Sequence, residues 1–351
     1  MKGTIAAGLV GVTGYAGMEL ARLMTSHPSM ELVRVTSRAE AGKKLSDLYP
    51  FLQGLGPGEL EVTEPDPRDL ATSCDVVFLA VPHKAAMEIA AVLLEEGVKV
   101  VDLSADFRLR DRCTYEQWYD VPHTRPELLE QAVYGLPELY ADRIPLANLI
   151  ANPGCYPTAS VLGLAPALKN GLVETDGVII DAKSGASGAG RGAKVPNLFC
   201  EVHDSFRAYG LPKHRHTPEI EQEAGLLAGT DMVLSFNTHL LPIDRGILAT
   251  IYTSLKDGVT MEAVREAYES FYADKPYVRV LPEGKFPETR FVRGTMFCDI
   301  GLVTDPRTGR LIILSAIDNL CRGASGQALA NANLMCGLDI SLGLPTAPLM
   351  P

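Results

Sequence analysis

Short apolar runs alternate with stretches of helical periodicity in the first third of the chain. Residues 4–12 (TIAAGLVGV) are apolar and end in a glycine turn, and residues 16–26 then carry apolar side chains at helical spacing. Further apolar runs at residues 32–36, 76–81 and 98–103 have the length of buried strands. Strands separated by helices need crossover connections, so this pattern predicts a doubly wound parallel sheet that binds ligands at the carboxyl ends of its strands.

The segment GVTGYAG at residues 11–17 stands where the first strand should end and the first helix begin. Glycines let the backbone approach a pyrophosphate closely, and a helix N-terminus favours negative charge. A plain tight turn would have the same composition, but the flanking strand and helix favour dinucleotide binding. The residues that we predict to contact the cofactor here are Gly11, Thr13, Gly14, Tyr15, Ala16 and Gly17.

The end of the second strand bears on the choice of dinucleotide. NAD sites usually carry an acidic residue here that binds the ribose hydroxyls, whereas this chain has Thr36, Ser37 and Arg38. A guanidinium can pair with a 2′-phosphate, although many arginines are simply solvated. The sequence therefore predicts NADP(H) as the cofactor, with Ser37 and Arg38 among its contacts.

The stretch ANPGCYPTAS at residues 151–160 places a cysteine at the start of a helix. Pro157 suits a first helical turn, residues 158–168 have a helical pattern, and Asn170 with Gly171 ends it. A helix N-terminus stabilises a thiolate through its dipole and its amides. We therefore predict Cys155 to be an exposed nucleophile.

Two histidines, His214 and His216, lie together in LPKHRHTPEI. Metal binding is the poorer interpretation because Lys213 and Arg215 would repel a cation, so no metal is predicted. A solvated basic turn is the structural alternative. An imidazole is nevertheless the natural partner of a nucleophilic thiol near neutral pH, and spacing alone does not separate the two rings.

Composition excludes several classes of partner. The chain has 351 residues and a net charge of −11, which gives no general attraction for nucleic acid or anionic membranes, and no apolar run reaches the length of a membrane span. Its seven cysteines form no C-x-x-C pair, which favours a reducing cytoplasm. Basic residues gather between 183 and 215, where KSGASGAGRG (183–192) is either an anion-binding loop or a mobile one.

Motifs spread over most of the chain resemble the N-acetyl-gamma-glutamyl-phosphate reductases of arginine biosynthesis. They are GVTGYAGMEL, DLSADFRL, NPGCYPT, KSGASGAGR, HRHTPEI, HLLPIDRGILATIY and NLCRGASGQALANAN. The resemblance implies an NADPH-dependent reduction of an acyl phosphate to a semialdehyde through a thioester on Cys155, with release of phosphate. It makes His216 the acid–base group, with His214 in reserve.

The resemblance also implies further contacts and an architecture. The implied cofactor contacts are Ser184, Gly185 and Asn319, and the candidate substrate contacts are Arg108, Asn152, Arg191, His214 and Arg245. The fold class would be a Rossmann-type doubly wound sheet plus an α+β domain with a mostly antiparallel sheet. The NADP-binding domain would cover residues 1–153 and 318–351, and residues 154–317 would form the catalytic domain that makes a homodimer or homotetramer.

Other functions stay open at this point. Aspartate-semialdehyde dehydrogenase shares the reaction class, and an aminoadipyl-phosphate reductase of lysine biosynthesis would act on a carrier-linked substrate. From a different class, an NADP-binding redox sensor would use an oxidisable cysteine. The NPGCYPT and HRHTPEI segments favour the acetylglutamyl substrate.

Overall fold

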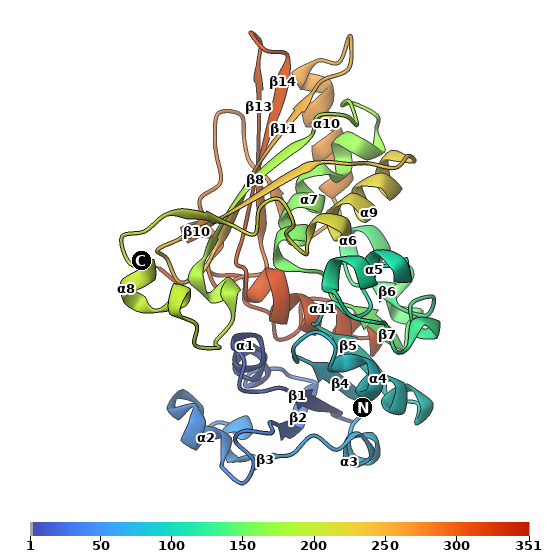
Figure 1. Cartoon of the computed structure of the whole chain (residues 1–351), viewed down its shortest axis with the longest axis vertical. Coiled ribbons are helices and arrows are strands. Elements are labelled where there is room, and N and C mark those ends of the chain that lie inside the picture. Colours follow the sequence, from blue (N-terminus) through green and yellow to red (C-terminus); the bar gives the residue numbers. More distant parts are fainter. Residues whose placement is uncertain (1–2, 351) are drawn as a thin grey trace. The chain divides into compact units, whose positions relative to one another are not determined.

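The computed structural model describes residues 3–350, which fold into two compact units (Figure 1). Unit 1 comprises the described residues up to Pro153 with two later segments, Gly190–Gly192 and Ala324–Leu344. Unit 2 comprises Gly154–Ala189, Ala193–Gly323 and the described residues from Pro345 onward. Residues 318–323 thus belong to unit 2 by their contacts, and the domain boundary at residue 318 stays a prediction.

Unit 1 is built on a seven-stranded sheet whose order is β3-β2-β1-β4-β5-β7-β6. Every neighbouring pair in it is parallel. Its strands are β1 (Ile5–Val10), β2 (Met30–Thr36), β3 (Val62–Thr63), β4 (Val76–Leu79), β5 (Lys99–Asp102), β6 (Val133–Tyr134) and β7 (Leu149–Ala151). The chain builds outward from β1 to β2 and β3 on one side and from β4 onward on the other. The predicted doubly wound parallel sheet is therefore confirmed, with its switch point between β1 and β4, where such sheets bind ligands.

Helices join the strands of unit 1, as crossover connections require. They are α1 (Tyr15–Met24), α2 (Leu45–Leu48), α3 (Pro67–Ser73), α4 (Ala86–Glu95), α5 (Arg112–Tyr119), α6 (Pro137–Tyr140) and α11 (Gly326–Met335). Local sequence explains where several begin: Asp66 accepts a hydrogen bond from the Arg68 amide before α3, and Asp111 caps α5 through the Thr114 amide. All four residues of β4 are buried, as expected for a parallel strand covered on both faces.

Unit 2 contains a second sheet of mixed direction, with the order β12-β13-β14-β11-β8-β10-β9. The β12–β13 and β8–β10 pairs are parallel and the other four are antiparallel. Its strands are β8 (Ile179–Gly185), β9 (Arg207–Tyr209), β10 (Ser235–Leu241), β11 (Ile247–Ser254), β12 (Val278–Val280), β13 (Cys298–Asp305) and β14 (Arg310–Ile317). This matches the expected mostly antiparallel sheet and completes the predicted fold class.

Helices cover one face of this second sheet. In unit 2, α7 (Cys155–Lys169) packs on β11 and β14 and lies beside α9 (Thr217–Ala228) and α10 (Met261–Tyr272), as Figure 1 shows, while α8 (Phe199–Val202) is a single turn elsewhere. Burial alternates along β11, where Ile247, Ala249 and Ile251 are buried. All residues of α7 from Tyr156 to Leu168 are buried, so the helix that carries Cys155 is fixed by packing all round.

The other face of the second sheet is only half-buried, and we call it the open face. Its side chains include Asp181, Lys183, His239, Leu248, Tyr252, Ile312 and Leu314. Asp181 pairs with Lys183 at 2.7 Å and with His239 at 3.1 Å, and apolar side chains follow on the neighbouring strands. None of the helices in the described part of the chain is long and apolar enough to cross a membrane.

Candidate active site

The glycines of residues 11–17 have distinct geometric roles. Gly11 has φ +90°, and a Cβ there would lie 2.4 Å from the Ala80 oxygen on the loop after β4. A Cβ on Gly17 would lie 2.4 Å from the Gly11 oxygen, so Gly17 lets α1 pack closely on the turn. Gly14 caps α1, and the nearest atom to a Cβ there is 3.8 Å away. Two glycines thus make the turn, and the third leaves space at the helix N-terminus for an anion.

The carboxyl end of β2 lies beside this glycine turn. The amides of Gly11 and Val12 donate to the Thr36 oxygen, and the hydroxyls of Thr13 and Ser37 are 3.4 Å apart. Ser37 is buried, whereas Arg38 is exposed. Tyr15 and Ala16 form the first turn of α1. The structure therefore brings the predicted residues of the glycine turn and of the second strand into one place.

Arg191 joins this group, although it is far away in the sequence. Its guanidinium donates to the Thr13 oxygen at 3.1 Å and to the Tyr49 hydroxyl at 2.7 Å, and it lies 5.3 Å from the Tyr49 ring centroid. Tyr49 in turn donates to the Val12 oxygen. These contacts place the charge of Arg191 at the glycine turn, and its contact with the substrate stays a prediction.

Arg108 and Asn152 make hydrogen bonds within unit 1. Arg108 is buried and donates to the oxygens of Asn152 at 2.7 Å and Leu103 at 2.9 Å. The Asn152 side chain donates to the Ala324 oxygen and accepts from the Asn331 amide at 3.0 Å. Both residues hold three chain segments together, so their predicted contact with substrate remains a prediction that these bonds do not favour.

Two buried acids shape the loop that follows β5. The Asp106 carboxylate accepts from the amides of Lys84 and Ala86 and from the Tyr115 hydroxyl at 2.7 Å. Asp102 accepts from Ser104, and burial together with the charge of Asp106 raises the pKa of Asp102 to about 7. The loop after β4 is thereby tied to the loop after β5 at the carboxyl edge of the sheet.

Cys155 is the first residue of α7, as predicted, and it is partly exposed. Gly154 caps the helix, and the Thr158 amide makes the first helical bond to the Gly154 oxygen at 2.9 Å. Pro157 has no N–H, so the helix-start amides beyond Gly154 are those of Cys155 and Tyr156 alone. A Cβ on Gly323 would lie 2.6 Å from the Cys155 Cβ, so this glycine makes room for the cysteine.

Aromatic rings surround the two histidines of unit 2. The Tyr156 ring lies edge-on to His214 at 5.5 Å and to His216 at 6.0 Å between centroids, and the two imidazoles are 5.0 Å apart. The Tyr156 and Tyr209 hydroxyls are 2.8 Å apart, and burial raises the pKa of both, that of Tyr209 to about 12. Because Tyr156 directly follows Cys155, the cluster places both histidines in the neighbourhood of the nucleophile.

The two histidines differ in environment. Burial, reinforced by the charge of Arg215, lowers the pKa of His214 to about 4. The His214 Nδ1 accepts a hydrogen bond from the His216 amide at 3.1 Å, which leaves the proton of the neutral ring on Nε2. His214 is therefore an uncharged donor at neutral pH, and its ring is half-buried against Tyr156, Tyr209 and Phe236.

Glu219 is a site residue that the sequence analysis did not identify. It lies in the first turn of α9, is 1% exposed, and accepts the Gly154 amide at 2.8 Å. The sequence signal was a glutamate three residues after His216, the usual position of a helix-capping acid. That signal predicts a local cap, whereas the carboxylate contacts α7.

Ser184, Gly185, Asn319 and Arg245 come together in a second group within unit 2. Asn319 accepts the Gly246 amide at 2.8 Å and donates to the Ser187 hydroxyl at 2.9 Å. Ser184 is buried and donates to the Gly185 oxygen, and a Cβ on Gly185 would lie 2.8 Å from the Asp244 oxygen. Arg245 pairs with the buried Asp318 at 3.7 Å. The KSGASG segment is thus a strand end held by neighbouring loops.

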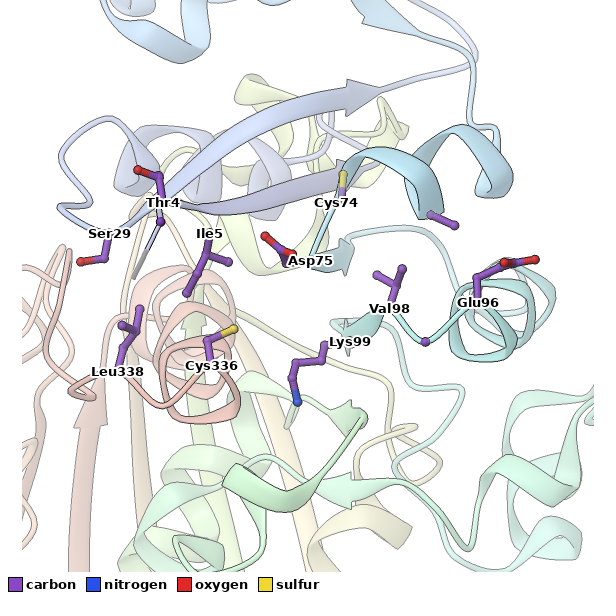
Figure 2. Close-up of a pocket in the computed structure, with 13 residues that line it drawn as sticks. Thr4, Ile5, Ser29, Cys74, Asp75, Glu96, Val98, Lys99, Cys336 and Leu338 are labelled. Carbon is purple, nitrogen blue, oxygen red and sulfur yellow. The ribbon is translucent and has the colours of Figure 1, made fainter. Parts of the chain in front are cut away.

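The described residues offer no cluster of metal ligands, and a cavity elsewhere in unit 1 does not fit the cofactor. Among the residues that the structure describes, no three His, Cys, Asp or Glu side chains are grouped to hold a metal ion. A cavity of about 1030 Å³ lies in unit 1 at the amino ends of β1, β4 and β5. Figure 2 shows Ile5, Asp75 and Lys99 among the residues that line it. Doubly wound sheets bind ligands at the opposite end of their strands, so this cavity is not the cofactor site.

Comparison with known proteins covers both units. Residues 6–147 match the family "Semialdehyde dehydrogenase, NAD binding domain", and residues 155–319 match "Semialdehyde dehydrogenase, dimerisation domain". The chain is similar to an N-acetyl-gamma-glutamyl-phosphate reductase of Geobacter sp. (strain M21), with 53% identity over 98% of this chain and 99% of the relative. It is similarly related to that of Desulfotalea psychrophila (strain LSv54 / DSM 12343), with 52% identity and the same two coverages.

Solved structures with the same fold are more distant in sequence. Aspartate semialdehyde dehydrogenase II from Vibrio cholerae has a TM-score of 0.71 at 15% identity and covers 95% of this chain and 99% of its own. The Candida albicans aspartate semialdehyde dehydrogenase with NADP has a TM-score of 0.69 at 19% identity, covering 95% and 98%. These likenesses support the two-unit fold.

Proposed function

Because this chain belongs to the family of N-acetyl-gamma-glutamyl-phosphate reductases, we propose that it reduces N-acetyl-gamma-glutamyl phosphate to N-acetylglutamate semialdehyde with NADPH and releases phosphate. In this proposal the reaction is a cytoplasmic step of arginine biosynthesis. The observation that carries it is Cys155 at the first position of α7, in the same compact unit as His214 and His216.

The first chemical step uses the Cys155 sulfur as nucleophile. The thiol gives its proton to an imidazole, the sulfur attacks the acyl carbon, and the bond from that carbon to the phosphate oxygen breaks. The products of this step are a thioester on Cys155 and inorganic phosphate. Negative charge on the carbonyl oxygen in the transition state is opposed by the helix-start amides, which Pro157 limits to Cys155 and Tyr156.

The second step reduces the thioester and frees the thiol. NADPH, when bound, supplies the hydride for this reduction. The protein's own part is to move a proton to and from the oxygen of the resulting thiohemiacetal, whose carbon–sulfur bond then breaks to give the aldehyde. Aromatic packing around Tyr156 keeps the imidazoles oriented during both steps.

The environments of the two histidines support His216 as the acid–base group. His214 stays uncharged above about pH 4, and its Nδ1 is already an acceptor for the His216 amide. A ring in that state donates a hydrogen bond from Nε2 but does not store a proton at neutral pH. We therefore give His214 the role of a substrate-orienting donor.

The residues of the glycine turn suit NADP(H). Gly14 leaves space at the start of α1 for a pyrophosphate, and the carboxyl end of β2 carries no acidic residue. Arg38 is exposed there for a 2′-phosphate, and Arg191 brings a second positive charge to the turn. The contacts of Ser184, Gly185 and Asn319 with the cofactor are part of the same proposal.

Arg245 is the candidate in unit 2 for the anionic groups of the substrate. Its side chain is 19% exposed and is held by Asp318 at 3.7 Å, which orients the guanidinium without fully covering it. A homodimer or homotetramer formed through the open face completes the proposal, because residues 155–319 match a dimerisation domain.

The decisive test is phosphate-dependent reduction of NADP with three semialdehydes. We expect N-acetylglutamate semialdehyde to be the preferred substrate, and Cys155→Ser to abolish its turnover. Cys113→Ser, at an exposed cysteine on α5, is the matched control and should keep full activity. Preference for aspartate semialdehyde or for a carrier-linked aminoadipate semialdehyde would refute the substrate assignment, and full activity of Cys155→Ser would refute the mechanism.

A further inference from the structure

We propose that Glu219 is a positioning residue that fixes the nucleophile helix α7 against the histidine-bearing start of α9. This inference rests on the proposed function for its catalytic meaning. The Glu219 carboxylate accepts a hydrogen bond at 2.8 Å from the amide of Gly154, which caps α7 and directly precedes Cys155. Through this bond it acts on the nucleophile by way of the residue that caps α7.

The position of Glu219 in α9 makes the bond a link between two functional segments. His216 is the residue that precedes α9, and Glu219 lies three residues further on, in its first turn. A glutamate at this position ordinarily reaches back to the start of its own helix. Here it spans 65 residues to Gly154, so a single carboxylate joins the segment of His216 to that of Cys155.

Burial makes this link rigid. Glu219 is 1% exposed, and a buried carboxylate whose hydrogen-bond donor is removed pays a large desolvation cost. Loss of the bond should let the peptide before Cys155 rotate and move the thiol away from the helix-start amides.

The bond also determines which amides at the start of α7 can bind an oxygen in the transition state. Glu219 occupies the amide of Gly154, and Pro157 has none. The remaining amides belong to Cys155 and Tyr156, adjacent to the reacting sulfur. Glu219 thus confines the anion-binding part of the helix start to the two amides that can reach the acyl oxygen.

Two substitutions separate the hydrogen bond from side-chain volume. Glu219→Met fills the same space but accepts no hydrogen bond, whereas Glu219→Gln keeps an acceptor oxygen and loses the charge. Glu221 is the matched control on the same helix, since it accepts the Leu234 amide at 3.1 Å on the side of β10. Glu221→Met therefore removes a bond that does not involve α7, and Glu221→Gln keeps an acceptor for that bond while it removes the charge.

With N-acetylglutamate semialdehyde as substrate, we expect Glu219→Met to lower kcat about 30-fold with KM within about threefold. Glu219→Gln should restore kcat to within about fivefold of the parent protein. Both Glu221 variants should keep kcat, and Glu221→Met should lower the thermal midpoint. Equal kcat in Glu219→Met and the parent, or equal losses of kcat in Glu219→Met and Glu221→Met, would overturn the proposal.

A second readout does not depend on the substrate. Limited alkylation with iodoacetamide, followed by peptide mass spectrometry, gives the rate at Cys155 relative to exposed Cys113 in the same molecule. Both Glu219 variants lack the charge, so their difference reports the loss of the hydrogen-bond acceptor. We expect the Cys155 to Cys113 ratio to be at least about threefold lower in Glu219→Met than in Glu219→Gln. Equal ratios would overturn the positioning role even if the parent protein proved to reduce a different acyl phosphate.

Discussion

Replacing His214 by asparagine tests how the site keeps this ring uncharged. Burial and the neighbouring Arg215 lower the pKa of His214 to about 4, from an ordinary value of 6.5. The unfolded chain therefore binds a proton at this position in the window between those two values, and the folded chain does not. Stability should fall as the pH falls through that window. Asparagine keeps an acceptor for the His216 amide but cannot be protonated.

The size of the effect follows from the two pKa values. At about pH 5 the ring of the unfolded chain is almost fully protonated, while that of the folded chain is almost fully neutral. The resulting loss of folding free energy between about pH 7.5 and about pH 5 is about 2 kcal/mol for this residue alone. His214→Asn should remove this part of the pH dependence. His203→Asn, at an exposed histidine after α8, should not.

Urea unfolding followed by circular dichroism at the two pH values measures this difference. Fluorescence is unsuitable, because the single tryptophan, Trp118, lies in unit 1. The parent and His203→Asn should lose about 2 kcal/mol more than His214→Asn on acidification. An NMR titration should place the His214 ring near pH 4 in the folded protein. Equal pH dependence in all three proteins, together with an ordinary titration near pH 6.5, would refute both the buried neutral ring and the preference for His216 as acid–base group.

Three further changes test other parts of the structure. The pKa of Asp102 is about 7 in the folded state and 3.8 in the unfolded state, so stability should fall as the pH rises between those values. Asp102→Asn should abolish this fall, which is on the order of 2–4 kcal/mol, in urea titrations. An unchanged profile would contradict the raised pKa. Gly323→Ala should lower kcat at least about tenfold, because the new Cβ would lie 2.6 Å from the Cβ of Cys155. Gly56→Ala, at a position with open space around it, should leave the kinetics unchanged. A parent-like kcat in Gly323→Ala would show that the cysteine can shift freely. Arg38→Ala should lower kcat/KM for NADPH about 10–100-fold and leave that for NADH within about threefold, and equal effects on both cofactors would exclude a 2′-phosphate contact.

Features that depend on local backbone pattern were predictable from the sequence. The glycine turn, the strand and helix around it, and Cys155 at a helix start follow from glycine, proline and apolar spacing, and the structure places all three as expected. The parallel sheet follows from the alternation of strands and helices. These features need only contacts between residues close in the chain, or between elements that follow one another.

Contacts between distant segments were beyond that kind of inference. The Arg108 guanidinium donates to the backbone oxygens of Leu103 and Asn152, and the Asn152 side chain contacts Asn331, which is 179 residues away in the chain. The role of Glu219 depends in the same way on the packing of α9 against α7. A polar side chain in a motif does not reveal whether its partner is a ligand or the backbone, because both offer the same hydrogen-bonding groups.

The half-buried apolar side chains of the open face have a consequence for every stability measurement on this protein. Leu248, Tyr252, Ile312 and Leu314 lie side by side on neighbouring strands, on the same face as Asp181 and its two partners. If a second copy covers them, as proposed, association and folding are linked by mass action. The apparent resistance to urea or heat then increases with protein concentration, and dilution alone would make the protein less stable.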